Sequence, residues 1–501
     1  MKKDLLLGID FGTGGCKITL IDCKGKVLDS RSGEYPTNHP HSGWAEQNPM
    51  DWYKVMCGLL REMPFKERIA ALSLDSYTHG AVLLDEDMKV IRPTIIWTDQ
   101  RSVSECEFLN KHHRDLVFKT ACQMPAPTWT LPQMMWLQNN EPDALRKTRH
   151  ISFVKDYIRF LLTGELSVDY IEAQGTLFFD IEKRCWSKKL CEIAGIPVEA
   201  LPAIAEPTDV AGKITAESAA ETGLPEGVTV VTGTSDSAIE DYAAGAVKPG
   251  QCILKLATAG NVNVMTSEAH PHPETLTYSH VVPGMWYTVT ATNAAAICQR
   301  WFRDNFCEKE IAQAESDNVN VYDLIDKEAE KSPIGSNGVF FHPYLMGERS
   351  PYWNPNLRAG FTGMSMATTK GDCIRALLEG VAFSLRDCYR TIEKMGLKVD
   401  EFILIGGGAK SPLWSRIICD VFNAPVKSPA SCDASFGSAL LAGVGIGIFS
   451  DELDAIEQCL EFKQHLEPIP ENAEHYAKQF THYRKIHDVM ADVYRNLNTN
   501  H

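Results

Sequence analysis

The chain has 501 residues, a formal net charge of −16 and 44% apolar residues. A chain of this length predicts two to four domains, and the apolar content is sufficient for a packed core. The acidic balance argues against nucleic acid and anionic membrane as main partners, because both would be repelled by most of such a surface.

The first residues and the cysteines indicate the compartment. MKKDLLLGIDFGTGG has only a short apolar run, includes Asp10 and alternates like a strand, so it does not predict a secretory signal. The sequence contains no uninterrupted apolar run of about 18 residues, so it predicts no membrane span. The 15 cysteines form no CxxC pair, which predicts neither a zinc site nor a disulfide framework. Reduced thiols favour the cytoplasm.

Residues 1–100 predict a strand-rich start. The expected elements are strands at 5–9, 16–21, 70–75, 80–84 and 93–97 and one helix near 50–62. The first two strands join through a bend that contains Gly12, Thr13 and Gly14. Glycines at such a bend allow positive φ and let N–H groups approach an anion closely.

Helices are predicted over residues 101–165, where SVSECEFLNKHH and LPQMMWLQNN place apolar residues at helical spacing. The run VTVVTGTSD at 228–236 predicts a buried strand ending in a polar turn, with a helix from about Ser237. Asp236 therefore lies where a strand meets a helix. A carboxylate there either acts as a general base in phosphoryl transfer or caps the helix, and this residue alone leaves both open.

The second half repeats the pattern of the first. CILKLATAGNVNVMT predicts a hairpin over 252–266 whose bend contains Thr258 and Gly260. The other expected elements are a strand at 286–291, helices at 293–303 and 371–394, a strand at 401–408, a helix from Pro412 and a last helix at 472–496. Two such hairpins predict an ATP-binding cleft between related domains at 1–246 and 247–501.

Polar residues follow the ends of several predicted strands. His79, Trp97, Asp99 and Arg101 suit the recognition of a polyol, whose hydroxyls need several donors and acceptors. The alternatives are a structural histidine and an exposed Asp99–Arg101 ion pair of little energetic consequence. Asp10 either positions Mg²⁺ through water or is only a turn residue.

Two features of the second half complete the candidate site. IGGGAKSPLWSRIICD, residues 405–420, places small residues where adenine and ribose could lie against backbone at a helix start. It lacks GxGxxG spacing, which argues against an NAD-linked dehydrogenase. In the apolar helix at 371–387, Glu379 needs a partner to be buried, and Arg375 one turn earlier is predicted to supply it.

These motifs together resemble the FGGY carbohydrate kinases, over about residues 5–490. The matching segments are GIDFGTGG, HGAVLLDED, RPTIIWTDQRS, GTSDSA, LATAGN, PYLMGERSPYWNP, RALLEGVAFSLRD and IGGGAKSPLWSRIICD. Within the family the chain is most similar to the xylulokinases. The resemblance implies an α/β fold of two actin-like (ribonuclease H-like) domains, each βββαβαβα, that close over a sugar and MgATP.

The resemblance also implies a role for each matching residue. Asp236 is the catalytic base. Asp10 and Asp236 lie near Mg²⁺, and Thr78, His79, Asp99 and Trp129 lie with Asp236 on the sugar side. The residues implied on the nucleotide side are Gly12, Thr13, Gly14, Lys17, Thr258, Gly260, Gly407, Gly408, Ala409 and Ser411. A homodimer would be ordinary for the family.

Departures from the xylulokinase pattern fall near the sugar. Those enzymes usually read GQMHG where this chain reads SYTHG, so Tyr77 and Thr78 replace an amide and a thioether. Ser237 stands where they usually carry Asn, and Gln133 where they carry Lys. The interpretation that Tyr77 and Thr78 line the sugar pocket predicts a substrate with a different hydroxyl pattern from D-xylulose, or with one more polar carbon. From the family resemblance we expect an ATP-dependent kinase for a terminal hydroxyl of a ketopentose. Kinases for another sugar, polyol or sugar acid, and a non-catalytic actin-like sensor, are the alternatives.

Overall fold

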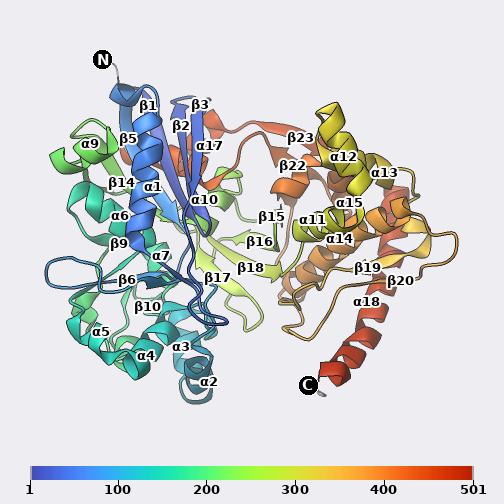
Figure 1. Cartoon of the computed structure of the whole chain (residues 1–501), viewed down its shortest axis with the longest axis horizontal. Coiled ribbons are helices and arrows are strands. Elements are labelled where there is room, and N and C mark those ends of the chain that lie inside the picture. The colour runs from blue at the N-terminus through green and yellow to red at the C-terminus, as the bar shows by residue number, and fades with distance from the viewer. Residues whose placement is uncertain (1–2, 499–501) are drawn as a thin grey trace.

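Two mixed β-sheets, one in each half of the chain, organise the molecule (Figure 1). The computed structural model describes residues 3–498. The first sheet contains, in spatial order, β13 (Val210–Lys213), β14 (Thr229–Ser235), β5 (Ile69–Ser76), β1 (Leu5–Gly12), β2 (Gly15–Asp22) and β3 (Val27–Glu34). The second contains β17 (Leu276–Ser279), β18 (Trp286–Thr292), β16 (Gly260–Thr266), β15 (Gln251–Leu256), β21 (Glu401–Ile405), β22 (Val426–Pro429) and β23 (Phe462–Leu466).

Both sheets share one five-strand topology. β1 pairs antiparallel with β2 and parallel with β5, which pairs parallel with β14. In the second half, β15 pairs antiparallel with β16 and parallel with β21, which pairs parallel with β22. The third strands, β3 and β18, flank β2 and β16 antiparallel. This repeat confirms the predicted pair of ribonuclease H-like, actin-like α/β domains.

Helices complete the βββαβαβα order of each half. The first half uses α1 (Pro49–Glu62), α6 (Val154–Thr163) and α10 (Asp236–Ala243). The second uses α14 (Lys370–Lys394), α15 (Pro412–Phe422) and α16 (Ala434–Gly445), and α18 (Pro470–Asn498) packs on α15. Asn48 and Thr369 begin α1 and α14 by accepting backbone N–H bonds, the usual role of such N-caps.

The remaining elements form insertions around the two sheets. In the first half they are β4 (Glu46–Gln47), β6 (Ala81–Leu84), β7 (Thr94–Ile95), α2 (Val103–His112), α3 (Arg114–Ala121), α4 (Thr130–Asn140), α5 (Pro142–Lys147), β8 (His150–Phe153), β9 (Ser167–Asp169), α7 (Tyr170–Gln174), β10 (Phe179–Asp180), β11 (Cys185–Trp186), α8 (Lys188–Ile193), β12 (Ala203–Ala205) and α9 (Ala216–Thr222). In the second half they are α11 (Ala296–Phe306), α12 (Glu308–Asp317), α13 (Val321–Ala329), β19 (Phe340–His342), β20 (Gly360–Thr362) and α17 (Glu452–Cys459).

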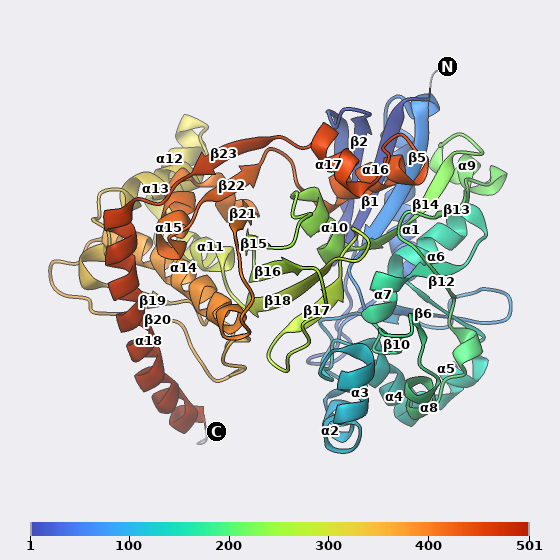
Figure 2. The same cartoon turned by 180° about the vertical axis from the view of Figure 1, so that it is seen from behind.

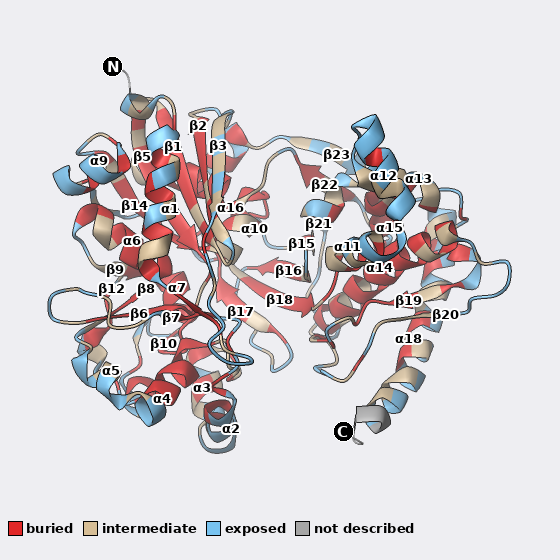
Figure 3. Ribbon diagram, viewed as in Figure 1, coloured by how far each residue is buried: buried red, intermediate tan, exposed pale blue. Residues whose placement is uncertain are grey.

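The central strands and the helices that face them form the core (Figure 3). In β1, Leu5, Leu6, Leu7 and Ile9 are all fully buried, as expected for a strand covered on both faces. Helices α1 and α6 pack on one another and on strands of the first sheet, and α16 packs on β1 and β5. Helix α14 is buried along most of its length in the second half.

One segment of the second half returns to the first sheet (Figure 2). Helix α16 lies so close to β1 that a side chain on Gly8 would collide with the backbone of Ser435. Helix α10 lies between the two sheets, where Ile239 and Tyr242 share a core with Ile253 of β15. The predicted domain boundary between residues 246 and 247 stays a prediction. Helices α16 and α17 come after this boundary in the sequence but lie with the first half in the folded chain.

Most predicted elements are present, with differences at glycines and edges. The strand expected at 401–408 ends at Ile405, because Gly406 has a φ of 93° and residues 407–410 form a 3₁₀ turn. The strand expected at 93–97 is only Thr94–Ile95, and β3, an exposed edge strand, was not predicted. The Arg375–Glu379 pair is confirmed, with Nε and Oε1 2.9 Å apart.

The structure also bears on the predictions made from the cysteines and from the apolar runs. All 15 cysteines are free thiols, and most are buried. No helix within residues 3–498 is both long enough and apolar enough to cross a bilayer.

Candidate active site

Asp236 stands at the end of β14, where the chain enters α10. Ser235 occupies the N-cap position, so Asp236 is the first helical residue and the helix-cap interpretation is wrong. Its Oδ1 accepts a 2.6 Å hydrogen bond from the N–H of Ser237. Burial raises the pKa of Asp236 to about 6, with Lys255 lowering it and Glu240 raising it. A carboxylate with this pKa can take up a hydroxyl proton near neutral pH.

Two further carboxylates lie beside Asp236. Asp10 in β1 is paired in register with Asp75 in β5. Burial, followed by the charges of Asp236 and Glu240, raises the pKa of Asp10 to about 7 against the lowering effect of a hydrogen bond with Asp75. Asp75 is fully buried, and its Oδ2 accepts a 2.6 Å bond from the hydroxyl of Ser438. Sequence reasoning missed Asp75, although a lone acid in IAALSLDS was a usable signal.

This excess of negative charge suits a divalent cation. Among residues 3–498, no group of three or more His, Cys, Asp or Glu side chains could hold a metal by itself. Mg²⁺ uses one or two carboxylates and takes its other ligands from water and phosphate. Asp10 and Asp236 therefore fit an ion that arrives with a nucleotide, and their role as its ligands stays a prediction.

Hydrogen bonds from other segments hold both predicted bends. In the first, Thr13 accepts a 2.7 Å hydrogen bond at its carbonyl from Gln47, and its hydroxyl accepts one of 2.8 Å from Trp97. In the second, the N–H of Ala295 donates to the carbonyl of Thr258 at 2.9 Å. Gly14 and Thr258 are exposed. Both bends are thus fixed from behind and leave their tips accessible, as phosphate binding requires.

The turn at residues 407–410 forms a wall of two cavities. A cavity of about 350 Å³ is lined by Lys17, Glu240 and Asp433 together with Gly407 and Ala409. Lys17 pairs there with Asp433, with Nζ and Oδ2 2.9 Å apart.

A second cavity, of about 360 Å³, lies against the same turn and is lined by Gln299, Arg300, Tyr322, Asp326, Gly407, Gly408 and Ser411. The Ser411 hydroxyl accepts a 3.0 Å bond from the N–H of Trp414 and so begins α15. Gly408 has no room for a side chain, because Leu256 and Trp414 are in the way. The predicted adenosine-side residues therefore line open space large enough for a nucleoside.

On the predicted sugar side, His79 has a φ of 80° between β5 and β6. Its Nδ1 bonds the carbonyl of Gly175, its Nε2 lies 2.9 Å from the Thr78 hydroxyl, and its ring centroid lies 4.6 Å from that of Trp129. Burial lowers the pKa of His79 to about 4, so the imidazole is neutral at pH 7. The structure thus brings Thr78, His79 and Trp129 together.

Asp99 lies in a buried ion pair rather than an exposed one. Its oxygens accept bonds of 2.9 and 2.8 Å from the Arg101 side chain and of 2.6 Å from the N–H of Ala45. The Arg101 guanidinium stacks 3.8 Å from the Trp44 ring centroid. The surface-pair interpretation is therefore wrong, and a sugar contact by Asp99 stays a prediction.

Tyr77 points away from the predicted sugar side. It is fully buried, and its hydroxyl donates a 2.8 Å bond to Oε1 of Gln47, which also accepts 2.9 Å from Trp52. Gln47 in turn supports Thr13. Because its phenol supports the bend at residues 12–14 through Gln47, the interpretation that Tyr77 lines the sugar pocket is wrong. Of the two departures in SYTHG, only the half-buried Thr78 lies beside His79.

The second half contributes residues that sequence reasoning missed. Tyr278 in β17 lies with its ring centroid 6.2 Å from that of Trp129 and stacks on Tyr287 of β18 at 5.5 Å. The Tyr287 hydroxyl lies 3.1 Å from that of Ser237, next to Asp236. These aromatic rings join the two halves beside Asp236, and alternation in a strand gave no sign of that pairing.

Comparison with known families places the chain among sugar kinases. Residues 5–241 match the N-terminal domain of the FGGY family of carbohydrate kinases, and residues 256–446 match its C-terminal domain. The chain is 31% identical to "Xylulose kinase" of Bacillus subtilis, over 97% of each chain. It is 29% identical to "Gluconokinase" of the same organism, over 94% of this chain and 93% of that one.

Solved structures agree with this match. The xylulose kinase from Rhodospirillum rubrum has a TM-score of 0.88 and 27% identity, covering 98% of this chain and all of the other. The gluconate kinase from Lactobacillus acidophilus has the same TM-score and 25% identity, covering 98% of this chain and 99% of the other. The glycerol kinase of Plasmodium falciparum with ADP, at 19% identity and a TM-score of 0.85, supports the fold alone.

Proposed function

Because the chain belongs to the FGGY family of carbohydrate kinases, we propose that it transfers the γ-phosphoryl group of ATP to a terminal hydroxyl of a ketopentose. The observation that carries this proposal is Asp236. It is the first residue of α10, directly after β14, and burial raises its pKa to about 6. Such a group suits a general base for a hydroxyl that attacks phosphorus.

The proposed reaction uses both halves of the molecule. Thr78, His79, Asp99 and Trp129 would hold the sugar, while the bends at Gly12–Gly14 and Thr258–Gly260 would hold the triphosphate. Asp236 takes the proton of the attacking hydroxyl. Mg²⁺, when bound beside Asp10 and Asp236, would neutralise charge on the phosphate oxygens. Domain closure over both substrates would exclude water and prevent ATP hydrolysis.

A neutral sugar is favoured over a sugar acid. The carboxylate of a sugar acid needs a cation or several donors. Among the described residues predicted for the sugar side, His79 is neutral at pH 7, and the guanidinium of Arg101 is buried and paired with Asp99 and Glu46. Lys155 is fully buried and paired with Asp156 and Asp169, so it cannot serve a substrate. These observations favour a ketose or polyol over gluconate.

An ADP-release assay over pentuloses, hexuloses, polyols and sugar acids tests the proposal. We expect the highest kcat/KM with a ketopentose, and a loss of ADP release with Asp236→Asn on the same substrate. A preference for gluconate or another sugar acid would overturn the ketopentose assignment. Full activity of Asp236→Asn would overturn the assignment of the base.

A further inference from the structure

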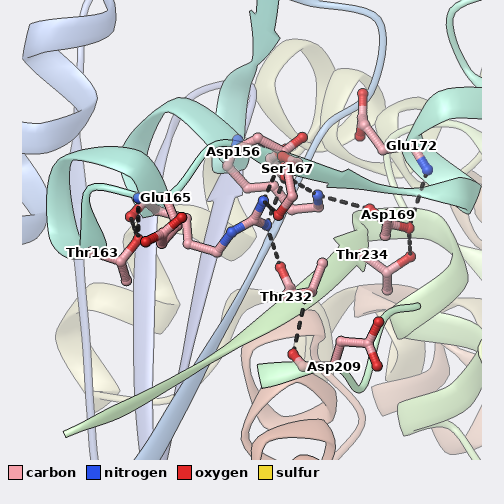
Figure 4. A network of polar contacts seen from close by, with 12 residues as sticks. Asp156, Thr163, Glu165, Ser167, Asp169, Glu172, Asp209, Thr232 and Thr234 are labelled. Atoms are coloured by element: carbon pink, nitrogen blue, oxygen red, sulfur yellow. Dashed lines mark hydrogen bonds and ion pairs between the residues drawn. The ribbon is translucent and has the colours of Figure 1, made fainter. Parts of the chain in front are cut away.

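Five charged residues form a fully buried network beneath β14 (Figure 4). Lys155, Asp156 and Arg159 come from α6, Asp169 caps α7, and Glu172 lies in α7. Lys155 Nζ lies 2.6 Å from Asp156 and 2.7 Å from Asp169, and Arg159 lies 2.7 Å from Asp156. Replacing such buried ion pairs with apolar side chains is often neutral or stabilising, so stability alone does not account for them.

Arg159 holds an irregular part of β14. The pairing of β14 with β5 is interrupted between Val231 and Thr234, where Gly233 has a φ of 77°. A side chain on Gly233 would collide with the carbonyl of Leu74. Within this irregular stretch, Arg159 donates a 2.7 Å bond to the carbonyl of Thr232. Bulges of this kind redirect the residues that follow them.

Asp169 holds the next part of the same strand. Its Oδ2 accepts a 2.8 Å bond from the Thr234 hydroxyl, along with bonds from the N–H groups of Ile171 and Glu172 at 3.1 and 3.2 Å. Thr234 lies two residues before Asp236. The strand is therefore fixed from the bulge almost to the carboxylate of the proposed base.

Helix α7 also contacts the predicted sugar side. Glu172 Oε1 accepts a 3.3 Å bond from the N–H of His79, and the residue after α7, Gly175, accepts from the His79 ring. Helix α7 thus contacts the His79 turn directly and the base-bearing strand through its cap. One rigid unit sets the separation between them.

We propose that Arg159, Asp169 and Thr234 are positioning residues, which fix the bulged end of β14 and thereby the place of the Asp236 carboxylate relative to the sugar hydroxyl held beside His79. This rests on the proposed function of Asp236. Phosphoryl transfer depends on alignment, and a misplacement of about 1 Å can cost on the order of 10²-fold in rate. None of the three touches a substrate.

Thr234→Val tests the proposal, because it removes the hydroxyl and keeps the shape. We expect kcat to fall about 10–100-fold with the KM for ATP unchanged, and Thr234→Ser to restore kcat. The matched control is Thr222→Val in α9, a fully buried threonine whose hydroxyl donates 2.6 Å to the carbonyl of Ser218. It should lower the thermal unfolding temperature without lowering kcat.

The outcomes separate positioning from stability and from the identity of the sugar. All variants are assayed with whichever sugar the wild type phosphorylates fastest, so an error in the ketopentose assignment leaves this test intact. Thr234→Val with kcat within twofold of wild type would overturn the proposal. So would an equal loss of kcat in Thr222→Val, or a Thr234→Ser variant as slow as Thr234→Val.

Discussion

Asp236 and Asp433 occupy corresponding places in the two halves. Each lies where the last parallel strand of its sheet, β14 or β22, leads into a helix, α10 or α16. Asp433 accepts bonds from the N–H of Phe436 at 3.0 Å and the hydroxyl of Ser435 at 2.6 Å, and it pairs with Lys17. Asp236 accepts one backbone bond, from Ser237.

The pKa values of the two carboxylates consequently shift in opposite directions. Burial opposes ionisation of Asp433, but Ser435, Lys17 and the Phe436 amide together hold its pKa below the usual value. Burial dominates at Asp236 and raises its pKa to about 6. A satisfied carboxylate caps a helix, whereas a poorly satisfied one is available for proton transfer. The partners, and not the place in the fold, separate the cap from the base.

Replacing each aspartate by asparagine should give the largest difference in kcat between the two positions. Asp236→Asn removes the base and should lower kcat by about 10²–10⁴-fold with little change in ATP binding. Asp433→Asn retains an oxygen that can cap α16 and should keep kcat within about threefold of wild type. Steady-state kinetics and nucleotide titration measure both. Comparable losses of kcat in the two variants would contradict the division of roles.

The pH dependence of turnover should report Asp236 and not Asp433. The base must be ionised, so kcat/KM should fall by about tenfold per pH unit below pH 6 and level off above it. Asp433, whose pKa is lowered, remains ionised in this range. The profile is measured between pH 4.5 and 8, with denaturation excluded by circular dichroism. A flat profile between pH 5 and 7 would be inconsistent with Asp236 as the base.

The fold was predictable because its signals are local. Hairpins around glycine bends and alternating or continuous apolar runs follow from periodicity and turn chemistry, and both halves carry them. What failed depended on neighbours from elsewhere in the chain. Gly406 ends β21 one residue after Ile405, and no feature of IGGG alone fixes that boundary.

The site was predictable in part for a similar reason. GTSDSA placed Asp236 at a strand end, yet only the N-cap at Ser235 and the paucity of partners show that it is no cap. SYTHG gave no indication that Tyr77 turns inward to Gln47 while Thr78 stays beside His79. Asp75 and Tyr278 reach the site through strand register, which one sequence does not reveal.

Lys17, the cation paired with Asp433, offers a further test of the comparison between Asp433 and Asp236. It pairs with Asp433 and lines the same cavity as Gly407 and Ala409. If it also serves the triphosphate, Lys17→Met should raise the KM for ATP roughly fivefold, equivalent to about 1 kcal/mol for a partly exposed charge, with kcat little changed. Lys463→Met removes a charge from the same cavity at an exposed position and should change KM by less than twofold.

The smallest expected effects are changes in the free energy of unfolding, and these have opposite signs for substitutions of Asp433 and Asp236. Asp433→Ala removes a helix cap and should lower the free energy of unfolding by about 1 kcal/mol. Asp236 has a folded pKa of about 6, above its unfolded value, so its contribution to stability is fully present below pH 4 and is lost as pH rises through 6. Asp236→Asn should therefore gain stability relative to wild type between pH 4 and 7, whereas Asp433→Asn should not. Urea unfolding at pH 4.5, 6 and 7.5 measures the difference, and a parallel pH dependence in the two variants would show that the carboxylates are held alike.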